Sequence, residues 1–298
     1  MRNLGAHVPT LALITKMNRN SIIILLFLIQ FQFGFAQTMI TGILIDSESN
    51  KEISYAHIGI KGKNIGIISH ENGKFELKST NDPLKLPIKV WFSHIGYETK
   101  VITINQSNYD NLIVKLDKKS FKLNEVVIRK TKDQLKLRKL GGFKKSKWTT
   151  GNANTNSYGK GEEYGIKIRA NKESYWIKTI NFHTKFNSMD SILFRLNIYK
   201  LSKNGLPETS ILNEQIFVKS YKNDKWITVD VEDKSLNIDQ DVILSIEPIK
   251  LWYDKEQSVE LFYSHCKNCG DSFYRESSFA KWEKNTKSAF AIYLEAEL

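Results

Sequence analysis

The chain has 298 residues, a formal net charge of +12, 41% hydrophobic residues and two cysteines. This length allows two modest domains, and the composition is that of a folded protein. Residues 1–36 hold three basic residues and no acid, so the rest carries +9, while residues 118–147 alone hold twelve basic and two acidic residues. The excess charge is therefore local, which excludes a polycation spread along the whole chain.

The first 36 residues predict a secretory signal peptide. Lys16 and Arg19 precede an apolar run that ends at the small residue Ala36. This order of basic residues, apolar run and small residue is typical of a cleavable signal, with Met17 as the expected start. The alternative is an uncleaved N-terminal anchor. We therefore expect an exported protein that is periplasmic or associated with the outer membrane or cell surface.

Residues 37–128 predict a small antiparallel β-sandwich. Asn72-Gly73 lies between extended segments and predicts a hairpin, because a tight turn needs positive φ, which glycine adopts freely. Phe75 and Leu77 alternate with charged residues, which is the period of a half-buried strand. Other short apolar runs flank this hairpin and are bounded by turn residues. They lie at 41–46, 55–60, 64–69 and 88–97.

This region resembles the carboxypeptidase regulatory-like domain, a transthyretin-like sandwich. The resemblance rests on Gly42 and Asp46, Ala56-His57-Ile58, Gly66, Asn72-Gly73-Lys74-Phe75, Gly96-Tyr97 and the closing phrase Leu123 to Ile128. It implies scaffold or interaction duty rather than peptide cleavage. Such domains also precede TonB-dependent receptors. The roughly 170 residues that follow are too few for a plug and a barrel of roughly 22 strands, so we do not expect the chain itself to be such a receptor.

Residues 129–161 predict a basic linker. The stretch 129–147 is rich in lysine and arginine but has too few apolar residues for an amphipathic helix, and 151–161 has loop composition. A charge block of this kind is typical of a solvated linker. The alternative is contact of 129–147 with an anionic envelope surface or acidic glycan. Nucleic acid is not expected as a partner, because the chain is exported.

Residues 162–298 predict a second β domain. Phe194, Leu196 and Ile198 alternate with polar residues, and turn pairs such as Asn204-Gly205 separate the extended runs. About eight antiparallel strands of this length fit a jelly roll. They are expected near 165–169, 176–182, 194–198, 215–218, 226–231, 242–246, 259–263 and 289–294. The predicted fold class is all-β: a transthyretin-like or Ig-like sandwich followed by a jelly-roll-like sandwich.

Cys266 and Cys269 form one C-x-x-C pair. A local disulfide is expected because exported thiols seldom stay reduced. Zinc is an alternative, but it needs about four ligands and only His265 stands nearby. A free or intermolecular thiol pair is a further alternative. Asp239 and Asp241 are candidates for a structural calcium, and no other metal or cofactor is expected.

No catalytic motif appears in the chain, neither H-E-x-x-H nor G-x-S-x-G, so we expect no enzyme activity. His57 and His94 fall in predicted strands and are expected to be ordinary packing or edge residues. Glycosidases need two acids across a cleft at no fixed sequence spacing. A hydrolase acting on polysaccharide therefore stays open as an alternative.

Aromatic residues of the second domain are the candidate ligand contacts. Trp252 and Tyr253 lie at a predicted strand end, and Trp282 follows a phrase that resembles accessory jelly-roll modules of exported bacterial proteins. Exposed aromatic patches tend to mark binding. The predicted function is a non-catalytic binding or scaffold protein of the cell envelope that contacts glycan or an envelope protein. The alternatives are an accessory protein of a TonB-dependent outer-membrane system and the hydrolase.

Overall fold

The predicted signal peptide lies outside the part of the chain that the structure describes, as does most of the predicted basic linker. The computed structural model describes residues 39–79, 84–120, 136–144, 150–152, 159–171, 173–254, 256, 258–286 and 288–298. In those ranges there is no helix with the length and apolar character needed to span a membrane. The export signal and the envelope location stay predictions.

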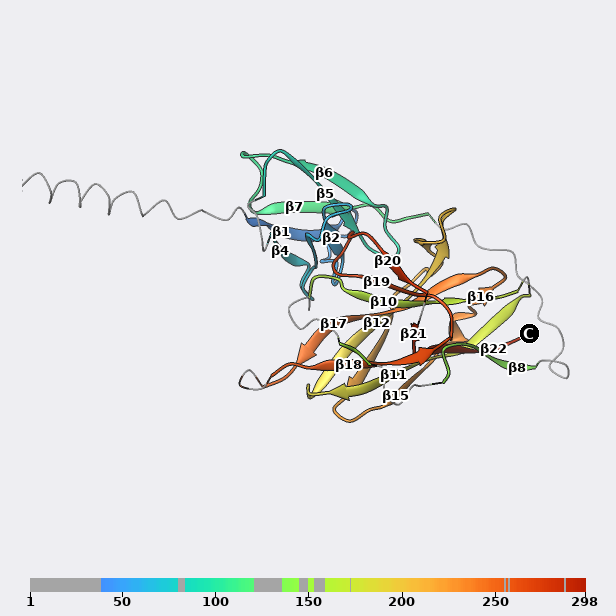
Figure 1. The fold of residues 1–298 in the computed structure, drawn as a ribbon. Helices are drawn as coiled ribbons and strands as arrows, with labels where there is room; N and C mark the ends of the chain where they lie inside the picture. Colours follow the sequence, from blue (N-terminus) through green and yellow to red (C-terminus); the bar gives the residue numbers. More distant parts are fainter. Residues whose placement is uncertain are drawn as a thin grey trace, which may run out of the picture. The chain divides into compact units, whose positions relative to one another are not determined.

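The first sandwich packs a three-stranded sheet on a four-stranded sheet (Figure 1). Its strands are β1 (Met39–Asp46), β2 (His57–Gly59), β3 (Gly66–Ile68), β4 (Lys74–Lys78), β5 (Ile88–Ser93), β6 (Lys100–Ile104) and β7 (Leu112–Leu116). The orders are β4-β1-β7 and β3-β2-β5-β6. The predicted sandwich is confirmed. It is not antiparallel throughout, because β1 and β7 run parallel.

The turn at Asn72-Gly73 connects β3 to β4, which belong to different sheets. It is therefore a corner between sheets and not the predicted hairpin of one sheet. Gly73 has φ +72°, and a Cβ there would lie 2.6 Å from the carbonyl oxygen of Leu44, so glycine is needed for two reasons. Beyond the turn, Phe75 and Leu77 are buried in the core as predicted.

The second sandwich packs a seven-stranded sheet on an eight-stranded sheet. The first of these contains β10 (Glu163–Ile168), β12 (Ser191–Leu201), β13 (Pro207–Ser210), β14 (Ile216–Tyr221), β17 (Val242–Trp252), β19 (Ser272–Arg275) and β20 (Glu283–Asn285). The second contains β8 (Leu137–Gly141), β9 (Thr150–Asn152), β11 (Tyr175–Asn187), β15 (Trp226–Asp230), β16 (Asn237–Ile238), β18 (Leu261–Lys267), β21 (Ser288–Phe290) and β22 (Ile292–Glu297). A short 3-10 turn, η4, spans Glu232–Lys234. The all-β class and the second sandwich are confirmed.

The range predicted as a basic linker contributes strands to the second sandwich. β8 pairs with β22, and β9 pairs with β18. Leu140 packs against the core from β8, while Lys139 forms an ion pair with Glu295 on the neighbouring strand at 3.1 Å. Lysine-rich sequence can therefore form an edge strand here, because an existing strand offers backbone partners and carboxylates for the lysines.

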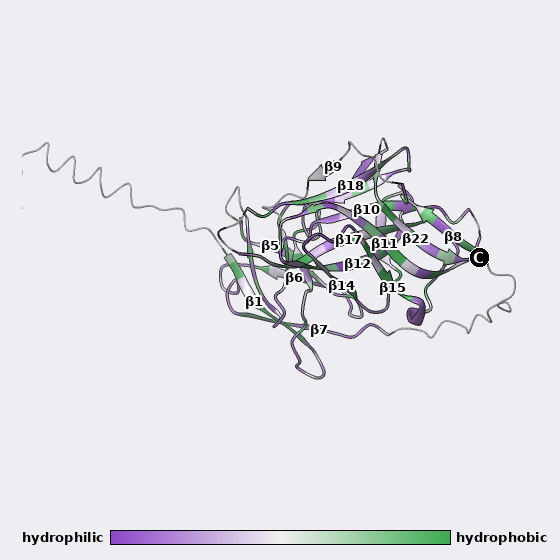
Figure 2. Ribbon diagram, turned by 90° about the horizontal axis from the view of Figure 1, so that it is seen from below, coloured by the Kyte–Doolittle hydropathy of each residue, from purple (hydrophilic) through white to green (hydrophobic). Residues whose placement is uncertain are grey.

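Alternation of apolar residues builds the core of the second sandwich, and in Figure 2 the strands carry most of the hydrophobic colour while the loops are largely hydrophilic. Along β12, Phe194, Leu196 and Ile198 are fully buried. In β11 the register with β22 shifts between Ile177 and Thr179. This bulge places Ile177 in the core and leaves Trp176 half-buried, so Trp176 does not share the face of Ile180 as the sequence period suggests.

Direct backbone contacts join the two sandwiches. The amide of Ile68 donates to the carbonyl of Gly159 at 2.7 Å, and the amide of Gly62 donates to the carbonyl of Phe279 at 2.8 Å. A Cβ at Gly66 would lie 2.2 Å from the carbonyl oxygen of Ser278. β3 therefore approaches the second sandwich at a distance that a larger residue does not allow.

Candidate functional site

A buried ionic cluster lies where the two sandwiches meet, and Arg195 is its centre. Phe194 and Leu196 point into the core of the second sandwich. Because successive side chains of a strand point to opposite faces, Arg195 between them points to the other face of the sheet. Register places it opposite Glu247 on β17. Arg195 is 1% exposed, and its Nε and one terminal nitrogen each lie 2.8 Å from Oε2 of Glu247. Its other terminal nitrogen donates to the carbonyl of Tyr55 at 2.6 Å.

A second ion pair extends the cluster within the same sheet. Arg275 on β19 is opposite Glu163 on β10 and donates to its carboxylate. Glu163 also accepts from the hydroxyls of Tyr199 at 3.0 Å and Ser245 at 2.8 Å. Trp282 stacks on the guanidinium of Arg275 at 4.9 Å. Both carboxylates of this cluster, Glu163 and Glu247, therefore have a guanidinium partner, which is what burial of charge requires.

His57 links this cluster to the first sandwich. Its Nε2 lies 2.6 Å from a terminal nitrogen of Arg195, and its Nδ1 lies 2.8 Å from the hydroxyl of Ser278. Guanidinium only donates, so Nε2 accepts and the proton of the neutral ring is on Nδ1. Burial, with Arg195 and Arg275, lowers the pKa of His57 well below its usual value. The expectation that His57 is an ordinary packing residue misses these contacts.

His57, Glu163 and Glu247 each offer one ligand atom within 4.8 Å of the others, which is a spacing that suits a metal ion. Arg195 lies against two of these atoms, and Arg275 against Glu163. Burial raises the pKa of Glu247 although Arg195 opposes this. The geometry therefore fits an arginine-bridged cluster better than a metal centre, since two neighbouring guanidinium groups oppose a further cation.

The lowered pKa of His94 predicts that the free energy of unfolding depends on pH. Burial, followed by the charge of Arg195, lowers the pKa of His94 from 6.5 to about 4. Between these values the unfolded chain binds a proton that the folded protein excludes, so the free energy of unfolding falls as the pH falls. We expect wild type to lose about 2 kcal/mol relative to His94→Gln from pH 6.5 to 4. Urea titrations across this range measure the loss, and a pH-independent difference between the two proteins would contradict it.

A groove of about 1350 Å³ lies beside the cluster and is lined by both sandwiches. Its first-sandwich wall includes Tyr55 and Glu71, and its second-sandwich wall includes Lys250 and Tyr253. Lys250 donates to the Glu71 carboxylate across the groove at 2.7 Å. That contact lowers the pKa of Glu71 and raises the pKa of Lys250, because each partner stabilises the charged form of the other.

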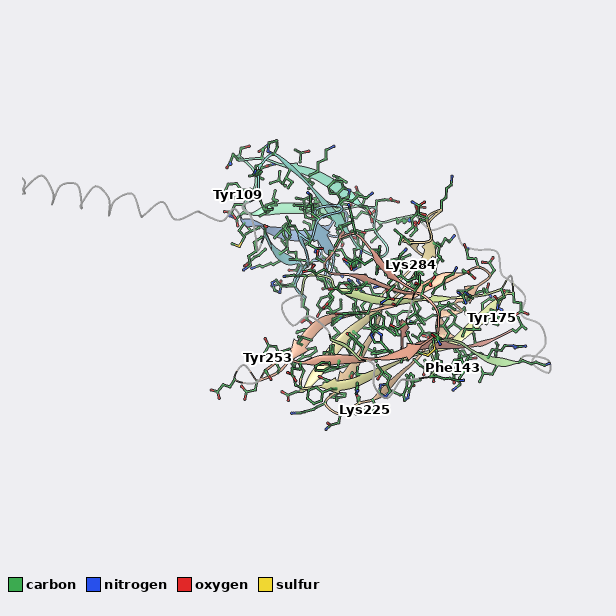
Figure 3. The ribbon with its side chains drawn as sticks, viewed as in Figure 1. Tyr109, Phe143, Tyr175, Lys225, Tyr253 and Lys284 are labelled. Atoms are coloured by element: carbon green, nitrogen blue, oxygen red, sulfur yellow. A yellow bond between two sulfur atoms is a disulfide. The ribbon has the colours of Figure 1, made fainter. Side chains whose placement is uncertain are left out.

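The predicted ligand contacts lie in different settings. Tyr253 is 42% exposed and lines the groove, at the end of β17 (Figure 3). Trp252 is half-buried, and the ammonium groups of Lys219 and Lys250 lie 4.4 and 5.0 Å from its ring centre. Trp282 lies against Arg275 and Tyr199. The structure thus brings Tyr253 and Trp252 to one region and places Trp282 beside the ionic cluster.

The remaining predicted site residues form a disulfide or make polar contacts within the protein. Cys266 and Cys269 are joined as a disulfide, with their Cα atoms 5.5 Å apart. Asp241 accepts from Lys167 at 2.8 Å and from the amide of Ala170 at 3.1 Å. Asp239 lies two residues before it, at the start of the loop into β17. A calcium ion at these two acids stays a prediction.

The sequence does not indicate that four residues form one buried cluster: Arg195, Glu247, Glu163 and Arg275. The signal lies in the alternation itself, since Arg195, Asn197 and Tyr199 form the second face of a strand whose first face is apolar. A charged residue on that second face normally points to solvent. Here the first sandwich covers this second face of β12, and no pattern in the neighbouring sequence indicates that it is covered.

Comparison with known proteins supports the fold of the first sandwich. No curated protein matches the sequence. Two structures of Cwp84, a surface layer associated cysteine protease of Clostridium difficile, align over 88% of this chain at 9% and 8% identity, with TM-scores of 0.39 and 0.38. The chain spans 58% and 65% of those two structures. A protein of Bacteroides uniformis that is proposed to bind carbohydrate aligns over 88% of this chain and 99% of its own length, at 9% identity and a TM-score of 0.20.

These structural similarities are too weak to carry an argument about function. The sequence match to a family is more specific, and it covers residues 40–128. It includes the first sandwich from the second residue of β1 to the end of β7, and with it the corner turn at Gly73. Residues 40–128 of this chain therefore match the CarboxypepD_reg-like domain, and a second, jelly-roll-like β-sandwich follows them.

Proposed function

We propose that this protein is a non-catalytic, exported binding protein of the cell envelope, and that it holds a glycan chain in the groove between its two sandwiches. The observation that carries the proposal is the lining of that groove. Tyr55 and Tyr253 contribute aromatic rings from opposite walls, and Glu71 and Lys250 contribute a charged pair between them.

The chemistry of these side chains suits a sugar. Pyranose rings have apolar faces that stack on aromatic planes, while their hydroxyls bind charged and amide groups. Tyr253 is 42% exposed, and Tyr55 is held in place by an edge contact with Phe217 at 5.7 Å between ring centres. The groove exceeds the volume of about 300–1,000 Å³ usual for small-molecule sites, which favours an extended chain.

The electrostatics of the acids favour binding over hydrolysis. A glycosidase needs a carboxylic acid that stays protonated near neutral pH, so its pKa must be raised. In the groove, Lys250 lowers the pKa of Glu71 instead. Glu163 and Glu247 are each fully buried against an arginine at the cluster, away from the groove lining. These contacts support a protein that holds its ligand without converting it.

An envelope role fits the domain composition. CarboxypepD_reg-like domains are regulatory and not catalytic parts of proteins, and the predicted signal peptide would place this one outside the cytoplasm. An envelope protein as partner is the alternative occupant of the same groove. The basic residues of 129–147 would then add a sequence-independent attraction to anionic surfaces.

Tyr253→Ala is expected to weaken glycan binding about tenfold or more, because it removes the stacking surface while leaving the core intact. A glycan array with the full-length protein identifies the strongest-binding oligosaccharide, and calorimetry then compares the variants with it. Tyr221→Ala is the matched control, since Tyr221 is 56% exposed but does not line the groove.

The array also tests the alternatives. Failure to bind any glycan, or equal binding by wild type and both Tyr253→Ala and Tyr55→Ala, would reject the glycan proposal. Release of shorter sugars from the bound oligosaccharide would instead establish a hydrolase. Capture of one envelope protein that Tyr253→Ala no longer captures would move the proposal to a protein ligand.

A further inference from the structure

A second cavity, of about 470 Å³, lies on another side of the ionic cluster, between β5 with the loop after it and the strands β12 and β13. Its volume falls within the range of about 300–1,000 Å³ typical of small-molecule sites. It shares no lining residue with the glycan groove. The cavity is therefore a candidate site for a separate ligand.

The charged side chains that line this cavity are mostly cationic. They are Lys61, Lys119, Arg195, Arg275 and one acid, Glu208. The carboxylates that pair with the arginines, Glu163 and Glu247, are not among the lining residues. The cavity therefore presents the cationic side of the cluster, while the carboxylates lie beyond it. Low-dielectric walls strengthen the attraction of such a surface for an anion.

Arg275 keeps hydrogen-bonding capacity that the cluster does not use. Its terminal nitrogen binds Glu163, while its Nε is buried and makes no hydrogen bond within the described part of the chain. A guanidinium carries five N–H donors in a planar fork that matches the two oxygens of a carboxylate. Trp282 stacks on this guanidinium and limits its movement.

Neutral groups complete the lining. Asn197 and Asn213 offer amides, Ser93 and Ser210 offer hydroxyls, and Trp91 offers an aromatic surface. Asn197 is 2% exposed and is held by a hydrogen bond to Glu247 at 3.3 Å. A small organic molecule with one carboxylate and several hydroxyls could form an ion pair with the cationic side chains and hydrogen bonds with these neutral groups.

We infer that this cavity is a binding site for a small hydroxylated carboxylate, held by Lys61, Lys119 and Arg275. The rim lysines supply attraction and the arginine supplies orientation. The inference does not depend on the glycan groove, because the lining residues differ. Binding here would also hold the two sandwiches together, since Lys61 and Lys119 come from the first and Arg275 from the second.

Isothermal titration of the full-length protein with D-glucuronate tests the inference, with D-glucose and inorganic phosphate as comparison probes. Glucose has the same ring without the carboxylate, and phosphate has charge without the ring. Glucuronate is expected to bind at least tenfold more tightly than either probe. Equal binding of glucose, equal binding of phosphate, or no binding of glucuronate would each overturn the assignment.

Variants at the rim locate the site. Lys61→Gln and Lys119→Gln are each expected to weaken glucuronate binding about tenfold, because each removes one charge-assisted contact. Lys63→Gln is the matched control, an exposed lysine of the same loop that does not line the cavity. Equal affinity in all three variants and wild type would overturn the site.

A second readout does not depend on the variants. His94 lines the cavity, and burial with Arg195 holds its pKa near 4. An anion bound there would stabilise the protonated ring, so the pKa of His94 is expected to rise when glucuronate is added in an NMR titration. An unchanged pKa in the presence of bound glucuronate would place the ligand elsewhere.

Discussion

Arg195→Met is expected to lower the free energy of unfolding by about 3–5 kcal/mol. The side chain is 1% exposed and neutralises Glu247, which is itself fully buried. Methionine fills much of the volume but leaves the buried carboxylate without its guanidinium partner, so that Glu247 must carry an uncompensated charge or take up a proton. The substitution also removes the donors to Tyr55 and His57 that join the two sandwiches. Urea unfolding followed by tryptophan fluorescence measures the loss.

The double variant Arg195→Met with Glu247→Leu separates charge from packing. It is expected to recover most of the lost stability, because no uncompensated carboxylate stays buried. Lys234→Met is the control for an exposed pair, since it breaks a 2.9 Å contact with Glu214 and should cost at most about 1 kcal/mol. A double variant no more stable than Arg195→Met would show that the charge is not the cause.

Gly66→Ala is expected to destabilise the protein by about 3 kcal/mol through the contact between the sandwiches. The added Cβ would lie 2.2 Å from the carbonyl oxygen and 2.8 Å from the amide nitrogen of Ser278. Backbone atoms cannot rotate away as a flexible side chain can. Gly59 approaches the same carbonyl, so the added methyl group should push β2 and β3 away from the second sandwich together.

The measurement combines urea unfolding with hydrogen exchange. In Gly66→Ala, amides of β3 and of residues 276–279 should exchange faster, while the core of the second sandwich stays protected. Gly205→Ala is the control, because a Cβ there meets no atom within 4 Å and costs only the strain of its φ of +72°, about 1 kcal/mol. Equal destabilisation by the two substitutions would refute the steric explanation.

The sequence alone accounts for many of the strands and for much of their cores. Alternation of Phe75 and Leu77, and of Phe194 and Leu196, predicts which side chains are buried, because a strand turns successive residues to opposite faces. Gly73 predicts the tight turn through its positive φ. Each of these features depends on neighbouring residues, so a single stretch of chain contains the information.

Local pattern fails where distant segments supply the partner. The basic residues around Lys139 suggest a solvated linker, yet β22 offers them a strand edge and Glu295 offers a counter-ion. Asn72-Gly73 suggests a hairpin, yet the two strands join different sheets. In both cases the partner strand is supplied by residues far away in the sequence.

Sequence determined that this protein is a pair of β-sandwiches, the first of them similar to the CarboxypepD_reg-like domain, because strand period and turn residues are local properties. Only the tertiary structure decided that the second face of β12 is covered, and so made Arg195 a buried ion instead of a solvated one. His57 and Arg195 are 138 positions apart, and Arg195 and Glu247 are 52 apart. Contact between such distant residues arises from the packing of whole sheets, which no short stretch of sequence records.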